Sequence, residues 1–399
     1  MKDSSHTLRY GKWRAASHAS AYVLLGIPLG VQAIGSRIPN QDPAAIARGN
    51  AFAATADNPA ALYYNPAGIT QLEGHNVHIG SLFYLNVYGD YQSPSGERTE
   101  SINEILPVPS LHYAFSPKNS AFSFGLGVYA PFGLGMQWPE TAPFATAGYE
   151  SKLSYITATP VVAWKPHATL SVAAGPTFNY SKAKFHQSLG APGANLVVKG
   201  DDMAPGFCAG MLYQPYKEWS FGFTYRSRTD LEYDGTASTP LGTVSTTTHL
   251  KYPDVIVGGI SFRPTTNWNF EVNIDWANWD RVDNVVIDGI GSLTLNWESS
   301  FFYEFGVTRY LGQGYFISAG YFYSEASTPE ADFTPLVPDI NLHTGSLGFG
   351  YDGPRWRWAI AGQLIGGSWR TVDDANNPVV NGRWRIFTPT VSLSVGYRF

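Results

Sequence analysis

The sequence is poor in cysteine and in charged residues, and it lacks a long apolar run beyond its N-terminus. Cys208 is the one cysteine among 399 residues, so an internal disulfide is excluded and a cysteine metal site has no partners. Charged residues make up 14%, against about 25% in an average soluble protein. The net charge of −5 offers no basic surface for nucleic acid. Without an apolar run of roughly 18 residues, any membrane span must be built from strands, because only helices and closed barrels satisfy their backbone groups in lipid.

Aromatic residues and glycine are abundant, at 15% and 41 residues. In the last segment, 386–399, apolar and small polar residues alternate up to the terminal Phe399. One parity carries Phe387, Val391, Leu393, Val395, Tyr397 and Phe399, and the other carries Thr388, Thr390, Ser392, Ser394, Gly396 and Arg398. A strand that is apolar outward, small and polar inward and aromatic at its end is typical of the wall of a transmembrane β-barrel.

The N-terminus has the pattern of an export signal. Basic residues precede the apolar run 21–31, and Val31-Gln32-Ala33 predicts cleavage after Ala33. We therefore expect a signal peptide over residues 1–33. The alternative is an uncleaved signal anchor, which Pro28 and the shortness of the run disfavour.

Segments with a period of two, separated by turn signals, predict about fourteen strands between residues 75 and 399. Their connections alternate between short turns, such as Pro166-His167, and longer links, such as 327–339. This pattern predicts an all-β membrane protein, an antiparallel transmembrane barrel with both chain ends in the periplasm. A soluble β-sandwich or propeller is the alternative, but it favours strands of roughly five or six residues, and 168–187 is much longer.

Parity also sorts the charged residues of the expected wall. In the segment 220–234, Arg226 and Arg228 share a parity opposite to that of the aromatic residues. Because an arginine on the lipid face costs roughly 2–4 kcal/mol at the midplane, we expect both to point into the lumen. They serve there either as structural braces or as a ligand site.

The alternation disappears between residues 34 and 74, where the chain is rich in alanine. Asp42-Pro43, Asn58-Pro59 and Asn65-Pro66 each predict a short helical turn. About forty residues are too few to hold a separate core, so we expect this segment to fold inside the barrel. The predicted domains are a signal peptide (1–33), a lumenal N-terminal segment (34–74) and a barrel (75–399).

Several motifs together closely resemble the FadL/TodX family of outer-membrane transporters, over essentially the whole expected mature chain. They are Arg37-Ile38-Pro39-Asn40-Gln41-Asp42, Ala47-Arg48-Gly49-Asn50-Ala51-Phe52, Ala56-Asp57-Asn58-Pro59, Tyr64-Asn65-Pro66-Ala67-Gly68-Ile69-Thr70, Asp275-Trp276-Ala277-Asn278-Trp279, Phe305-Gly306-Val307-Thr308-Arg309-Tyr310, Phe333-Thr334-Pro335 and Val337-Pro338-Asp339. Each piece alone is weak, whereas their order and spacing are specific.

The resemblance implies a fourteen-stranded barrel whose lumen holds an N-terminal hatch. It also implies passive uptake of long-chain fatty acids or aromatic hydrocarbons, with lateral release through a kinked third strand. The Asn-Pro-Ala motif that the family places beside this kink corresponds to Asn65, Pro66 and Ala67. A second copy of these letters, at 58–60, fits the family pattern less well.

The expected third strand, 121–138, contains residues that can bend a wall. Proline removes a ladder hydrogen bond and glycine marks bulges, so Pro131, Phe132, Gly133 and Gly135 are the predicted kink and lateral opening. An ordinary bulge without a role in transport is the alternative interpretation.

Candidate substrate-binding residues follow from these expectations. They are Phe52, Leu62, Tyr63 and Tyr64 of the hatch, Phe144 in the external segment 138–149, and Arg226 and Arg228 as partners of a carboxylate. Segment 138–149 is either a landing surface for the substrate or a loop that only covers the barrel.

Two rival functions follow from the same strands. A general porin for polar solutes would leave the lumen open, which a hatch of about forty residues argues against. A lipid hydrolase needs a nucleophile and a histidine in alignment, and no such spacing is present. His75 and His78 would face opposite sides of a strand, so we expect no catalytic residue, metal or cofactor. The expected partners are a hydrophobic small molecule and outer-membrane lipids, and the resemblance favours a monomer.

Overall fold

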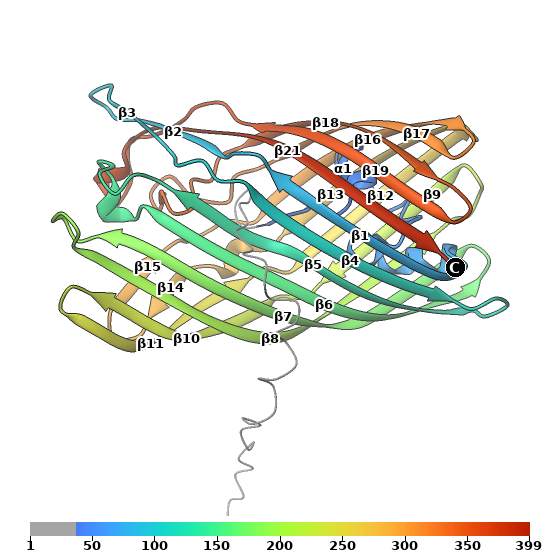
Figure 1. Cartoon of the computed structure of the whole chain (residues 1–399), viewed down its shortest axis with the longest axis horizontal. Coiled ribbons are helices and arrows are strands. Elements are labelled where there is room, and N and C mark those ends of the chain that lie inside the picture. Colours follow the sequence, from blue (N-terminus) through green and yellow to red (C-terminus); the bar gives the residue numbers. More distant parts are fainter. Residues whose placement is uncertain (1–36) are drawn as a thin grey trace, which may run out of the picture.

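The structure is a computed structural model that describes residues 37–399, and the predicted signal peptide lies outside them. Its 21 strands form a single sheet, drawn in Figure 1. The strands are β1 (Gly74–Tyr84), β2 (Tyr88–Gln92), β3 (Arg98–Glu100), β4 (Leu106–Ser116), β5 (Phe122–Gln137), β6 (Glu150–His167), β7 (Leu170–Ser188), β8 (Asn195–Tyr213), β9 (Trp219–Arg226), β10 (Thr229–Thr239), β11 (Gly242–Tyr252), β12 (Val255–Thr265), β13 (Trp268–Ala277), β14 (Asn284–Ile287), β15 (Gly291–Thr294), β16 (Ser300–Gly312), β17 (Tyr315–Ser324), β18 (Leu342–Asp352), β19 (Trp356–Gly366), β20 (Arg370–Val372) and β21 (Gly382–Arg398).

The sheet closes on itself. β1 pairs with β21 from Asn76–Arg398 to Tyr84–Thr390, and all the neighbouring pairs are antiparallel. Seven of the strands continue a neighbour along the same crossing of the wall: β2, β3, β10, β11, β14, β15 and β20. The wall therefore has fourteen antiparallel crossings, which confirms the predicted barrel.

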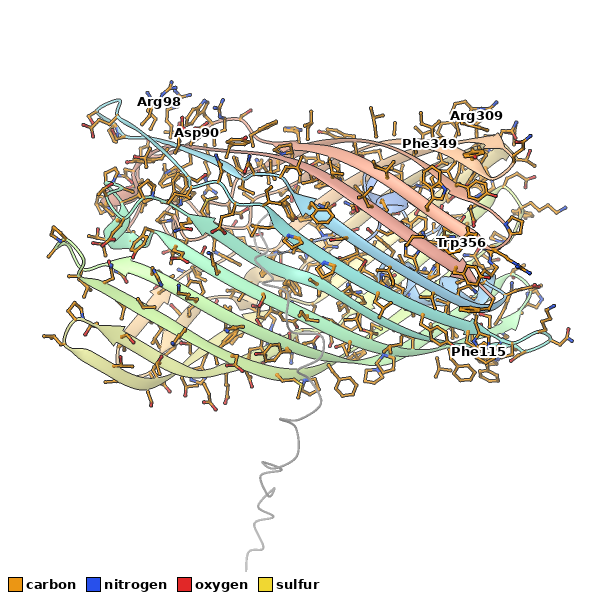
Figure 2. All side chains as sticks on the ribbon, viewed as in Figure 1. Asp90, Arg98, Phe115, Arg309, Phe349 and Trp356 are labelled. Atoms are coloured by element: carbon orange, nitrogen blue, oxygen red, sulfur yellow. The ribbon has the colours of Figure 1, made fainter. Side chains whose placement is uncertain are left out.

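The two ends of the barrel differ. At one end the connections are short, as between β6 and β7, and the N–H of Phe399 donates to the carbonyl of His75. The long links, such as the one between β17 and β18, lie at the other end. Figure 2 places Phe115 and Trp356 at the former, the turn end, and Asp90 and Arg98 at the latter, the loop end.

The outer face of the wall is apolar. On β13, Val272 and Ile274 are 44% and 48% exposed, whereas Glu271 and Asp275 are each 2% exposed. On β21, Leu393 is exposed and its neighbour Ser392 is buried. Alternation thus points the apolar parity outward, as expected. Within residues 37–399, no helix is both long and apolar enough to cross a membrane.

The predicted lumenal position of Arg228 is wrong. Arg226 ends β9 with its side chain buried, and Thr229 begins β10, also buried. In a regular strand, residues that face inward are an even number of positions apart. Arg226 and Thr229 are three positions apart, so one extra residue between β9 and β10 shifts the alternation. Arg228 is therefore exposed, and Leu231 faces inward instead of sharing the outer face of β9.

The N-terminal segment, residues 37–73, contains the three predicted turns. α1 (Pro43–Ile46) begins after Asp42, whose carboxylate accepts from the N–H groups of residues 44 and 45. α2 (Ala61–Tyr64) follows, and the 3₁₀ helix η1 (Pro66–Gln71) is capped by Asn65. Three further 3₁₀ turns lie at the loop end: η2 (Ala145–Ala147), η3 (Trp279–Arg281) and η4 (Pro378–Val380).

This segment lies inside the barrel (Figure 1). It packs so closely on the inner wall that a Cβ on Gly306 would lie 2.4 Å from the carbonyl oxygen of Arg48, and one on Gly222 would lie 2.1 Å from that of Ala53. Inward-facing glycine is therefore required on β9 and β16. The wall strands leave room for a backbone that runs directly against them.

Candidate functional site

The third wall strand, β5, carries a bulge at the predicted kink. Tyr129 pairs with Thr157 of β6 and Phe132 pairs with Tyr155, so β5 has one residue more than its partner over this interval. An extra residue bends a strand and interrupts its ladder. Pro131 lies within this interval and contributes no N–H.

The ladder between β4 and β5 covers only part of the two strands. In the described chain, its first pair is Phe115 with Phe124 and its last pair is Leu111 with Val128. Residues 106–110 of β4 pair only with β1, and residues 132–137 of β5 pair with β6. Pro107 and Pro109 lie on the unpaired part of β4, where proline is tolerated because an edge needs no donor. The wall thus has two free edges facing each other beside the bulge.

Residues 37–41 of the N-terminal segment occupy the free edge of β5. Arg37 forms an isolated antiparallel bridge with Phe132, and the N–H of Ile38 donates to the carbonyl of Pro131 at 2.8 Å. Nε2 of Gln41 donates to the carbonyl of Ala130 at 2.7 Å, and Oε1 of Gln41 accepts from its N–H. The segment therefore replaces the missing strand at the kink.

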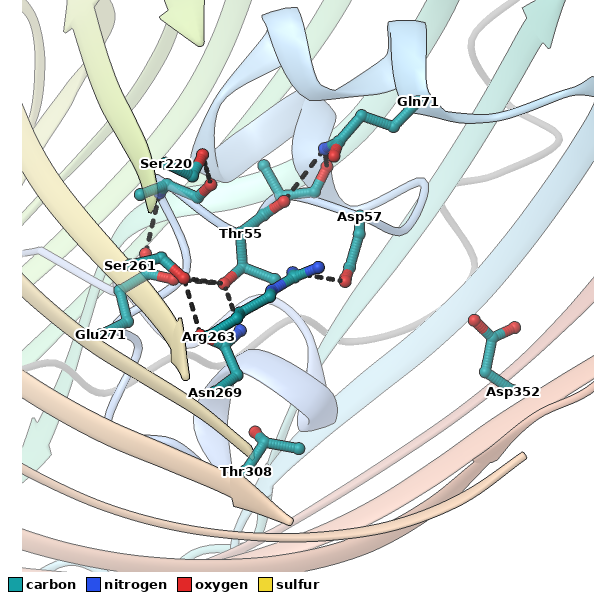
Figure 3. Close-up of polar contacts among 12 residues, drawn as sticks. Thr55, Asp57, Gln71, Ser220, Ser261, Arg263, Asn269, Glu271, Thr308 and Asp352 are labelled. Atoms are coloured by element: carbon teal, nitrogen blue, oxygen red, sulfur yellow. Dashed lines mark hydrogen bonds and ion pairs between the residues drawn. The ribbon is translucent and has the colours of Figure 1, made fainter. Parts of the chain in front are cut away.

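Buried ion pairs hold the same segment to the opposite wall. Arg37 donates to Asp275 of β13 at 2.5 Å, and Arg48 donates to Glu271 at 3.3 Å. Figure 3 shows the Thr55 hydroxyl beside Glu271, to which it donates. The segment is thus fixed to β5 by neutral hydrogen bonds and to β13 by charge-assisted ones.

A histidine pair lies next to these contacts. His78 of β1 and His112 of β4 are direct cross-strand partners and both are buried. Nε2 of His78 lies 2.6 Å from the Asp42 carboxylate, which also caps α1. The first helical turn of the segment is thereby tied to the two strands on the far side of the gap.

A cavity of about 330 Å³ lies between the loop end and this bulge. Its lining is mostly aliphatic and aromatic and comes from β6, β7, β8, β11, the hairpin β14–β15 and the links 277–283 and 325–341. The residues include Leu153, Phe185, Val198, Tyr252, Trp279, Leu293, Trp297 and Val337. Such a lining suits an uncharged, apolar ligand.

Phe132 connects the cavity to the bulge. Its ring centroid lies 5.0 Å from that of Tyr252 and 6.1 Å from that of Trp279, and both of these residues line the cavity. The backbone of Phe132 carries the bridge to Arg37. Any displacement of this ring by an occupant of the cavity would act directly on the bridge.

The motif Asn65-Pro66-Ala67 is placed against β8. Nδ2 of Asn65 donates to the carbonyl oxygens of Ala53 and Met211, and its Oδ1 accepts from the N–H of Ala67. The hydrogen bonds to the bulge come instead from residues 37–41. The transport role of this motif stays a prediction.

The other candidate residues lie outside this cavity. Leu62 packs on Gly125 and Gly127, while Phe52, Tyr63 and Tyr64 cluster around Tyr129. Phe144 is fully buried beside Tyr91, Trp138 and Trp384. Arg226 donates to the carbonyl of Tyr63 at 3.0 Å and lies over the Tyr63 ring, which is the position of a brace. Thr146 and Ala147, from the segment 138–149, do line the cavity.

Comparison with known proteins is consistent with this architecture. The chain is 23% identical over 353 residues to a long-chain fatty acid transport protein of Escherichia coli O6:H1, covering 75% of this chain and 78% of that protein. The fold matches that of a Pseudomonas aeruginosa FadL homologue, with a TM-score of 0.79 and 18% identity over 92% of this chain and 100% of that chain. It also matches the toluene transporter TbuX of Ralstonia pickettii, with a TM-score of 0.68 and 17% identity over 90% and 98% of the two chains.

A sequence model of the family described as "Outer membrane protein transport protein (OMPP1/FadL/TodX)" matches residues 29–354. This match spans well over half of the chain and includes the segment at the kink, the bulged strand and the cavity. The protein is thus an outer-membrane transport protein, as the closed apolar wall requires, and the chain belongs to the OMPP1/FadL/TodX family.

Proposed function

We propose that this protein takes up hydrophobic small molecules, long-chain fatty acids or aromatic hydrocarbons, by passive diffusion and releases them sideways between β4 and β5. The observation that carries this proposal is the position of Phe132, whose ring packs on cavity residues and whose backbone holds the segment at the free edge of β5. The printed names of relatives, a fatty acid transporter and toluene transporters, support the substrate class.

The energies of this route are compatible with passive transport. Freeing the edge of β5 breaks hydrogen bonds made by Ile38 and Gln41, each with a net value of about 0.5–1.5 kcal/mol. A solute that buries roughly 200 Å² of apolar surface gains about 5 kcal/mol at 25 cal/mol per Å². Binding can therefore offset the opening without an external energy source.

In this proposal residues 34–74 act as the hatch, residues 75–399 form the barrel, and residues 1–33 are the export signal. Buried contacts such as Arg48–Glu271 and Arg37–Asp275 hold most of the hatch in place, and only the backbone of residues 38–41 needs to leave the edge of β5. Asn65, Pro66 and Ala67 form the fixed part, because they are bonded to β8.

The ligand site in this proposal is the cavity. Thr146 and Ala147 join it from the segment 138–149, and Phe144 holds that segment in place from its aromatic cluster. The protein works as a monomer and leaves its substrate chemically unchanged.

Uptake by cells that lack their own hydrophobic transporter tests the proposal. Cells that produce the wild type are expected to accumulate labelled oleate or toluene. Deletion of Ala130 removes the extra residue of the bulge, so the strand straightens and uptake falls. A matched deletion of Gly96, in the exposed β2–β3 turn, leaves uptake unchanged. Undiminished uptake without Ala130, in protein that still shows heat-modifiable migration, would remove the lateral exit from the mechanism.

Planar-bilayer conductance separates this function from a general porin. The hatch fills the lumen through buried contacts, so only small, brief currents are expected. A large and steady ion current from the wild type would favour the porin.

A further inference from the structure

Three lysines form a row across the outer wall. Lys152 of β6 pairs directly with Lys184 of β7, and Lys184 pairs directly with Lys199 of β8. Their neighbours Leu153, Ala183 and Val198 are buried and face inward, so the alternation of each strand points the lysines outward. The row lies on the outside of the barrel, separate from the cavity and the kink.

The acidic residues around the row only partly balance it. Nζ of Lys152 lies 3.2 Å from Glu104, and Glu150 lies 3.6 Å from Nζ of both Lys152 and Lys184. In the described part of the chain, Lys199 makes no ion pair. Like charges directly opposite each other on neighbouring strands are destabilising, so a further anion at the row would be stabilising.

The height of the row on the barrel identifies its surroundings. Outward residues of β6 from Trp164 to Ile156 are apolar, and Ser154 and then Lys152 follow toward the loop end. With a rise of about 3.3 Å per residue and a tilt of roughly 40°, Lys152 lies about 30 Å from Trp164 along the barrel axis. The apolar band of such barrels is about 25 Å tall. The row is therefore one step beyond the hydrocarbon, at the level of lipid headgroups.

We propose that this row, called the lysine row below, binds the phosphorylated headgroup of a lipid in the outer leaflet. The long loops of outer-membrane barrels are extracellular, so the loop end meets that leaflet. Three ammonium groups provide point charges for phosphate. Below the row, past the outward rung of Ser154, Lys182 and Asp201, the apolar surface with Ile156 on β6 and the exposed Met203 on β8 receives the acyl chains. A lipid fits both surfaces, whereas a soluble anion fits only the first.

Native mass spectrometry of the purified, detergent-solubilised protein with added diphosphoryl lipid A tests this site. The variant Lys152→Gln/Lys184→Gln/Lys199→Gln is expected to bind this lipid roughly a hundredfold more weakly, since each lysine near an anionic lipid surface contributes to binding. The control Lys118→Gln/Lys165→Gln/Lys217→Gln removes the same charge at the turn end and retains wild-type binding. Heat-modifiable migration verifies that both variants are folded.

Two further ligands separate recognition of the phosphate groups from recognition of the acyl chains. A dephosphorylated lipid A with the same acyl chains is expected to bind weakly, and equally to wild type and lysine-row variant. The phosphorylated disaccharide without acyl chains is expected not to compete at equal concentration. Equal binding of diphosphoryl lipid A by the lysine-row variant and wild type, an equal loss in the control variant, or full competition by the soluble headgroup would each overturn the proposal.

Discussion

Arg37 and Phe132 form an antiparallel bridge that joins the N-terminal segment to the bulged strand. The Arg37 side chain reaches across the lumen to Asp275, while the Phe132 ring packs on Tyr252 and Trp279 of the cavity. One backbone contact therefore links the ligand cavity, the free edge of β5 and the far wall.

The substitution Asp275→Asn is expected to lower the free energy of unfolding by about 3–5 kcal/mol, because it leaves the buried Arg37 guanidinium without its carboxylate. Urea unfolding followed by tryptophan fluorescence measures the change. Asp230→Asn is the control, since Asp230 is 59% exposed and its pair with Arg281 is worth at most about 1 kcal/mol. An equal loss in both variants would contradict a special role for the Arg37 pair.

The substitution Gly49→Ala is expected to displace the hatch. Gly49 has φ +63°, and an added Cβ would lie 2.7 Å from the backbone of Tyr321. The expected readout is increased conductance in planar bilayers, together with faster proteolysis of the segment 37–73. Gly258→Ala is the matched control, because a Cβ there meets no described atom within 4 Å. Wild-type conductance from Gly49→Ala would show that the hatch tolerates this shift.

Filling the cavity is expected to reduce ligand binding. Leu293 lies on the hairpin β14–β15 and lines the cavity, so Leu293→Trp occupies part of its 330 Å³. Titration with a fluorescent fatty acid should show at least a severalfold weaker affinity. Leu364→Trp adds the same volume on the lipid-facing side of β19, where Leu364 is 59% exposed, and should bind like the wild type. Unchanged affinity in Leu293→Trp would place the ligand elsewhere.

Acid is expected to release two loops from each other. Glu330 accepts from the N–H groups of Asp373 and Asp374, and these hydrogen bonds lower the pKa of Glu330. Glu330 in turn raises the pKa of Asp373. Because the folded-state pKa of Glu330 lies below its usual value of about 4.3, its stabilising contribution is present above that value and is lost below it.

Hydrogen-exchange protection of the amides of Asp373 and Asp374 measures this release. Protection should persist down to about pH 4 and fall at lower pH. Glu330→Ala should remove it already at neutral pH. Protection in that variant equal to that of the wild type would show that other contacts hold the two loops together.

Local sequence patterns were sufficient to predict the barrel wall. The alternation in β13 and β21 depends on residues close in the chain, and so do the helix N-caps Asp42 and Asn65, each of which is followed by proline. The strands, the turns and the bend at Pro131 could therefore be predicted. The same rule failed at Arg228, because a single extra residue before β10 reverses every side chain that follows. A bulge without proline or glycine leaves no clear signal in the sequence.

The sequence by itself determined a closed barrel with an apolar exterior, a lumenal N-terminal segment and a bend in the third wall strand, since periodicity and backbone chemistry act over a few residues. Only the tertiary structure decided which residues pack against the bend and which line the cavity. Arg37 meets Phe132, and Trp297 meets Trp279, through contacts between distant parts of the chain. Such contacts depend on register and packing across the whole barrel, which no local pattern encodes.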